Sequence, residues 1–238
     1  MKRQRPSDAE TSLLCIFIFL DVPSLSHAAL VAKGWASAVR CLHAQRRADL
    51  SSGGEPRPVV VRGAAGYPSG FAYRASTRLP AGHDWPMDAT RTIDVYVTKH
   101  AAKGWALHAA HPIAPGAYLG EYAGDMVRTG DMDRASTYIV SVREEASDRV
   151  LRTNVDAGRV GNFTRFINHA CWPNAILDTY RRPDLRCVLP RLQIRALRQI
   201  ESDQEITIDY GVASGVGHTV CHCGSANCAG RLPFDASL

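Results

Sequence analysis

Three cysteines lie within eight residues near the end of the chain, in the pattern Cys221-x-Cys223-x4-Cys228. The chain holds seven cysteines, an odd number, so they cannot all pair as disulfides within one molecule. Cysteines this close together are too crowded for independent disulfides, whereas thiolates at short spacing are common ligands of a structural metal. The triplet therefore predicts a metal-stabilised segment and indicates a reducing compartment.

The composition is that of a folded, globular protein. The 238 residues are 45% hydrophobic and 21% charged, which excludes a disordered chain. The net charge of +5 indicates no particular partner, because 24 of the 28 basic residues are Arg and such a bias reflects genome composition as readily as a binding surface. No apolar run approaches the roughly 20 residues that a membrane-spanning helix needs.

The first residues bear some likeness to a signal peptide. A basic start is followed by an apolar run over 13–20. Two acidic residues, Asp8 and Glu10, lie in the basic region, and Asp21 ends the apolar run early. Together with the thiol cluster, these residues argue against secretion.

Residues 25–42 carry apolar side chains at helical spacing, and Ser24 is suited to cap that helix. The stretch 14–35 resembles an F-box, the short helical adaptor of ubiquitin ligases. A generic packing helix explains the same apolar spacing. We therefore expect a helical, F-box-like segment over 1–48, and the resemblance implies a ubiquitin-ligase adaptor subunit as a partner.

A change of composition near residue 50 predicts a domain boundary. Residues 49–91 are rich in Gly, Pro, Ser and Arg and are expected to form a linker or irregular region. From residue 92 onward, short β-branched or alternating runs are separated by turn signals, which predicts a mainly β domain of many small strands. The expected strands are 92–97, 118–122, 137–142, 150–155, 175–180, 185–189, 192–196 and 205–210.

Four motifs in this β region carry the candidate chemistry. They are Lys-Gly-Trp-Ala-Leu at 103–107, Gly-Glu-Tyr-Ala-Gly at 120–124, the Asn-, His- and Cys-bearing stretch 161–174, and Glu-Ile-Thr-Ile-Asp-Tyr-Gly at 205–211. Each alone is ambiguous, since a Gly-Trp pair is often a turn and a tyrosine at a strand end is usually structural.

In this order and at these separations, the motifs resemble the SET-domain protein lysine methyltransferases, with the cysteine triplet as their post-SET segment. The likeness covers roughly residues 92–233. It implies a SET-type β-clip fold, mainly β within the α+β class, with small sheets and a C-terminal pseudoknot that brings the strand before Tyr210 against Asn168 and His169. The implied domains are a SET domain over 92–212 and a post-SET zinc segment over 217–233.

The resemblance also implies S-adenosylmethionine as methyl donor. Residue types in the expected cleft suit this molecule, because glycine lets its polar head approach the backbone, an Asn amide both donates and accepts, and aromatic rings offer flat surface to the adenine. For the histidine, we expect its backbone more than its ring to face the adenine. The cofactor-binding residues implied are Lys103, Gly104, Trp105, Tyr138, Arg165, Asn168 and His169.

By the same resemblance, Tyr210 is the catalytic tyrosine and Tyr122 lines the channel for the substrate lysine. Related enzymes usually have Phe or Tyr two positions before the catalytic tyrosine, and a Tyr there holds a water and limits transfer to one methyl. This chain has Ile208 there. Since an aliphatic side chain cannot hold that water, we expect a capacity for more than one methyl.

The family pattern supplies the fourth zinc ligand from Cys171, which together with Cys221, Cys223 and Cys228 gives a closed site with four thiolates. Two histidines, His218 and His222, are alternative ligands. A closed site would hold the C-terminal segment over the cleft, where Leu232 and Phe234 could cover the adenine.

The resemblance implies a nuclear, chromatin-associated protein-lysine N-methyltransferase, with a histone tail as the substrate by analogy. Cytoplasmic action is the alternative location. Ala106 departs from the family, which usually has Gly there, and it keeps open a second hypothesis: an F-box-like adaptor whose SET domain binds a partner without catalysis. A zinc-dependent nucleic-acid module is less favoured, because the triplet has few basic neighbours.

Overall fold

The computed structural model describes residues 35, 49–63, 68–79, 91–145, 147–181, 189–211 and 215–234. The expected F-box-like segment, apart from Trp35, and most of the expected strand at 185–189 lie outside these residues. Within the described part, no helix is long and apolar enough to cross a membrane.

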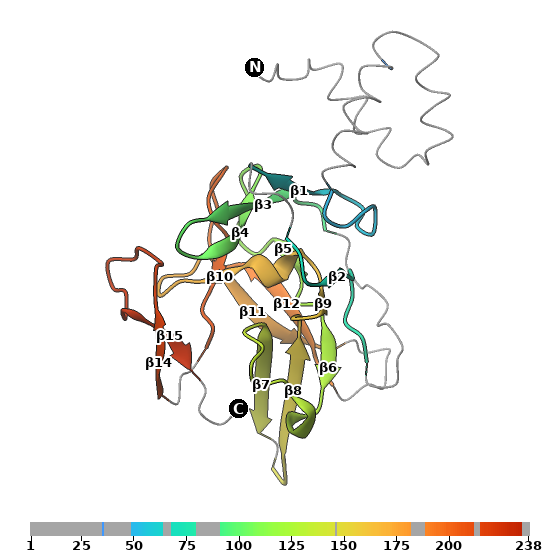
Figure 1. Cartoon of the computed structure of the whole chain (residues 1–238), viewed down its shortest axis with the longest axis vertical. Coiled ribbons are helices and arrows are strands. Elements are labelled where there is room, and N and C mark those ends of the chain that lie inside the picture. The colour runs from blue at the N-terminus through green and yellow to red at the C-terminus, as the bar shows by residue number, and fades with distance from the viewer. Residues whose placement is uncertain are drawn as a thin grey trace.

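Apart from Trp35, which is helical, the described residues form small sheets with two short 3-10 turns, so the expectation of a mainly β fold is confirmed (Figure 1). Strands expected from the alternating runs appear within a few residues of their predicted bounds.

One three-stranded sheet has the order β1-β3-β4, with β1 parallel to β3 and β3 antiparallel to β4. Its strands are β1 (Val59–Arg62), β3 (Val95–His100) and β4 (Gly104–Ala109).

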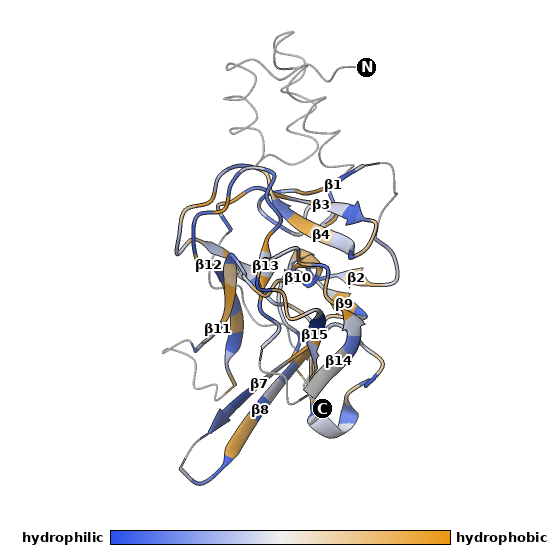
Figure 2. Cartoon of the chain, turned by 90° about the vertical axis from the view of Figure 1, so that its left-hand side faces the viewer, coloured by the Kyte–Doolittle hydropathy of each residue, from blue (hydrophilic) through white to orange (hydrophobic). Residues whose placement is uncertain are grey.

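Two more three-stranded sheets complete the larger part of the body. In one of them β11 alternates between covered and exposed residues, which is the pattern expected of a strand with one solvated face. The other includes the β7–β8 hairpin, which extends away from the remaining sheets (Figure 2). The sheets are β11 (Ala175–Tyr180), β12 (Arg191–Ala196) and β5 (Tyr118–Glu121), and β6 (Asp125–Val127), β8 (Val150–Asp156) and β7 (Ile139–Glu145).

Three short two-stranded pairings complete the described sheets, and two of them, β2–β9 and β10–β13, link segments that are distant in the chain. The turn η2 (Phe163–Phe166) begins at Asn162, whose side chain accepts from the Thr164 N–H, and it is buried over its whole length. A second turn is η1 (Thr129–Asp131). The pairs are β2 (Ala72–Tyr73) with β9 (Val160–Gly161), β10 (Asn168–His169) with β13 (Thr207–Ile208), and β14 (Gly215–Val220) with β15 (Arg231–Phe234).

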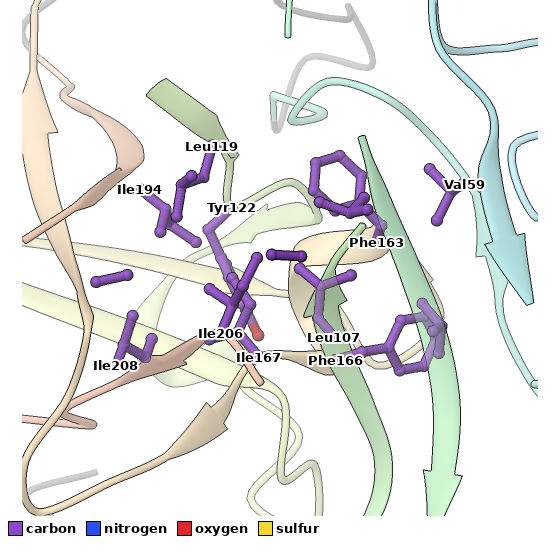
Figure 3. Packing of buried hydrophobic residues seen from close by; sticks show 14 of the residues in the cluster. Val59, Leu107, Leu119, Tyr122, Phe163, Phe166, Ile167, Ile194, Ile206 and Ile208 are labelled. Carbon is purple, nitrogen blue, oxygen red and sulfur yellow. The ribbon is translucent and has the colours of Figure 1, made fainter. Parts of the chain in front are cut away.

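One hydrophobic core joins these sheets. It takes fully buried side chains from β1, β3, β4, β5, β12 and η2, together with the chain around β13. Figure 3 shows Tyr122 within this cluster, in the company of Leu119 and Ile206. Small sheets that are each too narrow to be stable alone are therefore held together by shared apolar burial.

The segment before Tyr210 packs against two other parts of the chain. Its backbone pairs in parallel with β10, so that His169 lies opposite Ile208. On the other side, the Ile206 N–H donates to the Leu107 carbonyl at 2.8 Å, next to a bridge between His108 and Glu205. The expected contact of this segment with Asn168 and His169 is confirmed.

The structure corrects two expectations. The segment 49–91 was predicted to be a linker or irregular region, but its described residues place β1 and β2 in sheets of the body. Val59 is completely buried beside Val95, and this long-range pairing overrides the turn-forming composition of its neighbours. The strand predicted at 205–210 is only Thr207–Ile208, because its partner β10 is two residues long.

Candidate active site

Tyr210 lies just beyond β13 and is held at both ends. Its backbone N–H donates to Nδ1 of His169 at 3.3 Å, and its hydroxyl donates to the Ile167 carbonyl at 3.1 Å. Burial of the phenol, with a contribution from nearby Tyr138, raises the pKa of Tyr210 to about 12. The residue is still 49% exposed, so one side of it faces open space.

Tyr122, predicted to line the same site, is buried directly after β5. Its hydroxyl donates to the Tyr138 carbonyl at 2.7 Å. Burial raises the pKa of Tyr122 well above its ordinary value, and the neighbouring Tyr210 phenol adds to this effect. The structure thus brings the two predicted catalytic tyrosines, which lie more than 80 residues apart in the chain, to one place.

Tyr138 and Arg165 form a stack beside these tyrosines. The Arg165 guanidinium lies 3.9 Å from the centre of the Tyr138 ring and 4.2 Å from that of Phe71. It also donates to the Gly158 carbonyl at 3.3 Å. Burial lowers the pKa of Arg165 from its usual high value, although a guanidinium stays charged at neutral pH.

Asn168 and Lys103 are joined by a residue that the motif analysis did not single out. Glu205 accepts a hydrogen bond from Asn168 Nδ2 at 2.9 Å and forms an ion pair with Lys103 Nζ. Asn168 Nδ2 also donates to the Trp105 carbonyl at 3.2 Å. An acidic residue at the start of the 205–211 motif was the available signal for Glu205, but only the fold shows its partners.

Gly104 opens β4 with a φ of +75°, a conformation that favours glycine. A Cβ atom there would meet no other atom within 4 Å, so the space on that side of the backbone is open. Trp105 packs edge-on against Phe166, with ring centres 6.5 Å apart. The unusual Ala106 is fully buried within β4 opposite Thr98.

A cavity of about 190 Å³ lies between β10, Tyr210 and the C-terminal strands. Four of the nine predicted catalytic and cofactor residues line it, whereas Gly104, Trp105, Tyr122, Tyr138 and Arg165 lie outside its lining. The C-terminal strands supply side chains that motif analysis did not assign, except Leu232, which was expected to cover the cleft. The lining residues are Ala102, Lys103, Asn168, His169, Tyr210, Thr219, Val220, His222 and Leu232.

The four predicted metal ligands converge. The Sγ atoms of Cys171, Cys221, Cys223 and Cys228 all lie within 4.8 Å of one another. Thiolates about 2.3 Å from a shared zinc are roughly 3.8 Å apart at the corners of a tetrahedron, so the group has the right size. Among the described residues this is the one such cluster, and it contains no histidine. His222 instead lines the cavity.

Backbone N–H groups surround these sulfur atoms. Ala229 N donates to Cys171 Sγ at 3.3 Å, and Gly230 N donates to Cys228 Sγ at 3.3 Å. Burial opposes ionisation of Cys223, but hydrogen bonds with Ser225, Cys171 and Cys221 together lower the pKa of Cys223 to about 5, whereas burial raises the pKa of Cys221 to about 12. Donors aimed at sulfur stabilise thiolates, so the site is prepared for a cation.

Residues 104–211 match the family model of the SET domain. This chain contains a SET domain. The match begins at the first residue of β4 and ends just after Tyr210, so it includes the four motifs except Lys103, together with the junction of β10 with β13.

Curated relatives share this region. Histone-lysine N-methyltransferase SETMAR of Bos taurus is 31% identical over 169 residues, which cover 61% of this chain and 54% of the relative. Histone-lysine N-methyltransferase SUVR3 of Arabidopsis thaliana is 33% identical over 165 residues, which cover 60% of this chain and 46% of the relative. The matched SET region thus spans about half the length of these relatives.

Solved structures show the same SET fold. The methyltransferase domain of human SETMAR has a TM-score of 0.65 at 21% identity, and the alignment covers 79% of this chain and 98% of that one. KRYPTONITE in complex with mCHH DNA, H3(1-15) peptide and SAH has a TM-score of 0.64 at 23% identity, and the alignment covers 78% of this chain and 53% of that one. At these identities the likeness shows the fold.

Proposed function

We propose that this protein is an S-adenosylmethionine-dependent protein-lysine N-methyltransferase that acts on a histone tail. One observation carries the proposal: the fold brings Tyr210, Asn168, His169 and Lys103 to one cavity beside a four-cysteine cluster. The relatives named above are histone-lysine N-methyltransferases, which supports the substrate class. A histone substrate in turn supports action in the nucleus.

The cavity residues fit the proposed methyl donor. Asn168 offers an amide, Leu232 and Val220 offer apolar surface, and Gly104 leaves its backbone accessible nearby. S-adenosylmethionine supplies the methyl group on a positive sulfonium. The protein's contribution is to hold the donor and the amine in line and to exclude water.

The environment of Tyr210 suits a role in alignment rather than proton removal. Because its pKa is raised to about 12, the phenol stays protonated near neutral pH and cannot serve as a base. Its proton is directed at the Ile167 carbonyl. The oxygen lone pairs are then left to orient the substrate amine. The substrate lysine loses its proton because burial beside a positive sulfonium lowers the pKa of its ammonium group.

The four cysteines fit zinc, which would hold the post-SET strands over the cavity. Zinc with four thiolate ligands has no open position, so its contribution is structural.

The F-box-like adaptor hypothesis depends on residues 1–48, and no described contact favours it.

A labelled-methyl transfer assay on core histones and a histone peptide array tests the proposal. We expect the wild-type protein to transfer methyl groups to lysine. Tyr210→Phe should lose activity by roughly 100-fold or more, because an oriented polar contact in the transition state is removed. The variant should still bind S-adenosylmethionine in calorimetry with nearly unchanged affinity. A wild-type protein that binds no S-adenosylmethionine would refute the enzyme hypothesis.

A further inference from the structure

The imidazole of His169 lies between the cysteine cluster and Tyr210. Its side chain is only 3% exposed. Nδ1 is 3.3 Å from the backbone nitrogen of Tyr210, and Nε2 is 3.4 Å from Sγ of Cys171. One ring therefore contacts both the predicted metal site and the predicted catalytic tyrosine.

The partners of the ring determine where its proton lies. A backbone N–H can only donate, so Nδ1 must accept the hydrogen bond from Tyr210 and must be unprotonated. In a neutral ring the proton then lies on Nε2, where it points at the Cys171 sulfur. Asp209 does not compete with the Tyr210 N–H for Nδ1 of His169. Its carboxylate is 3.6 Å from Nδ1, is 60% exposed and accepts a hydrogen bond from the Gly211 N–H at 3.1 Å.

We propose that His169 is a positioning residue that couples the zinc site to the catalytic tyrosine. Its Nε2–H donates to the zinc-bound thiolate of Cys171, and its Nδ1 fixes the backbone of Tyr210. The inference rests on the proposed function in taking Tyr210 as catalytic and the four cysteines as zinc ligands. Groups that hydrogen-bond to metal ligands commonly orient those ligands and tune metal affinity.

Within the described part of the chain, few other hydrogen bonds hold Tyr210 in place. The pairing of β10 with β13 is only two residues long and ends at Ile208. Beyond it, the hydrogen bonds that Tyr210 makes with other described residues are those to His169 and to the Ile167 carbonyl. A shift of Cys171 on metal loss would move the His169 ring and release the backbone of Tyr210. Zinc would thus control the catalytic centre as well as the fold of the post-SET strands.

The ring tautomer in the wild-type protein gives the first test. Nitrogen-15 NMR of histidine-labelled, zinc-loaded protein distinguishes the two neutral tautomers and the charged ring, and a His169 variant assigns the signal. We expect the tautomer with the proton on Nε2. A proton on Nδ1, alone or together with Nε2, would overturn the coupling, because Tyr210 could not then donate to the ring.

Two variants test the two hydrogen bonds of the His169 ring separately. His169→Asn keeps an acceptor near the position of Nδ1 and loses the donor to Cys171, so it should release zinc to a chelator roughly 10-fold faster or more. The Tyr210 amide signal, read in tyrosine-labelled protein and assigned with Tyr210→Phe, should stay near its wild-type position. His169→Gln keeps a donor near Nε2 and loses the acceptor, so it should retain zinc but displace the Tyr210 signal.

The outcomes distinguish this proposal from the proposed function. Wild-type zinc release in His169→Asn, or a wild-type Tyr210 signal in His169→Gln, would overturn the coupling even in an active enzyme. The expected pattern in a protein without methyl transfer would support the coupling and refute the function. If both variants fail to fold, as judged by circular dichroism, the tautomer of the wild-type ring decides.

Discussion

At the scale of single residues, the site keeps two phenols neutral. Tyr122 is 6% exposed and donates its proton to the Tyr138 carbonyl, while Tyr210 donates to the Ile167 carbonyl. Burial raises the pKa of both hydroxyls. Under the proposed function, neutral phenols beside a positive methyl donor and an uncharged amine would leave the charge of the donor uncompensated, which would keep it reactive.

The raised pKa of Tyr122 predicts a loss of stability in alkali. An unfolded tyrosine ionises near pH 10, whereas the folded residue keeps its proton to higher pH. Full stability is therefore present below about pH 10, and above it the free energy of unfolding should fall by up to about 1.4 kcal/mol per pH unit for this group. Tyr122→Phe should flatten this fall. Urea unfolding between pH 8 and 11 would measure this difference. Equal slopes of the free energy of unfolding against pH in the wild type and in Tyr122→Phe would contradict the prediction.

Ile208 predicts the number of methyl groups transferred. It is 3% exposed and lies opposite His169 in β13, two positions before Tyr210. Mass spectra at exhaustive turnover should show more than one methyl on the product lysine. Ile208→Tyr should shift the product toward monomethyl-lysine, because its hydroxyl can hold a water in the channel.

The matched control is Ile208→Val, which keeps an aliphatic surface and should cost only about 0.5–1.5 kcal/mol of stability. Its products should match those of the wild type. Ile208→Tyr adds volume to a packed core at a cost of about 1–3 kcal/mol, so its fold must be checked by thermal unfolding. A wild-type product limited to monomethyl-lysine would refute the hypothesis.

At the scale of elements, the C-terminal strands form one wall of the cavity. Thr219, Val220 and Leu232 come from β14 and β15, which pair only with each other among the described strands. An isolated two-stranded hairpin is marginally stable in water. Cys221, Cys223 and Cys228 join this hairpin to Cys171 in the body, so its stability should depend on the metal.

Removal of zinc should therefore have a local effect. After chelation, hydrogen exchange should increase over 215–234 and at Tyr210, while β3 and β4 stay protected. The affinity for S-adenosylmethionine should fall in the same samples, measured by calorimetry. Zinc added back should restore both. A uniform rise in exchange across all sheets would show that the metal stabilises the whole fold instead.

At the scale of the whole molecule, segments far apart in the chain support one another. β1 lies parallel to β3 with Val59 opposite Val95, and both side chains are buried. β4, which carries Gly104 and Trp105, is the next strand of that sheet. The strands around the site are thus supported by a segment that precedes the SET region.

A chain beginning at residue 92 should consequently be less stable than one beginning at residue 49. Loss of β1 exposes apolar surface worth roughly 1.5–3 kcal/mol for each buried valine. At about 2–4 °C per kcal/mol, the melting temperature should fall by at least roughly 5 °C. Val59→Ala in the longer chain is the matched control, and it should lower the melting temperature less than the truncation does. Equal melting temperatures would show that β1 is dispensable.

Residue type and local spacing were sufficient to predict much of this protein. The alternating runs predicted six strands within a few residues of their bounds, since alternation is a local property of a half-buried strand. The spacing of Cys221, Cys223 and Cys228 indicated a shared metal because cysteines this close together are too crowded for independent disulfides. The assignment of Cys171, Tyr210 and Tyr122 needed the family resemblance in addition.

Other features were decided only by the tertiary structure. Glu205 joins Lys103 to Asn168 through a contact across 102 residues, and no local pattern encodes such a partner. β1 forms despite its turn-rich neighbourhood because pairing with β3 buries Val59. The sequence determined which chemical groups this protein carries and how its strands alternate. The tertiary structure decided which groups meet, because burial and sheet pairing act between segments that are distant in the chain.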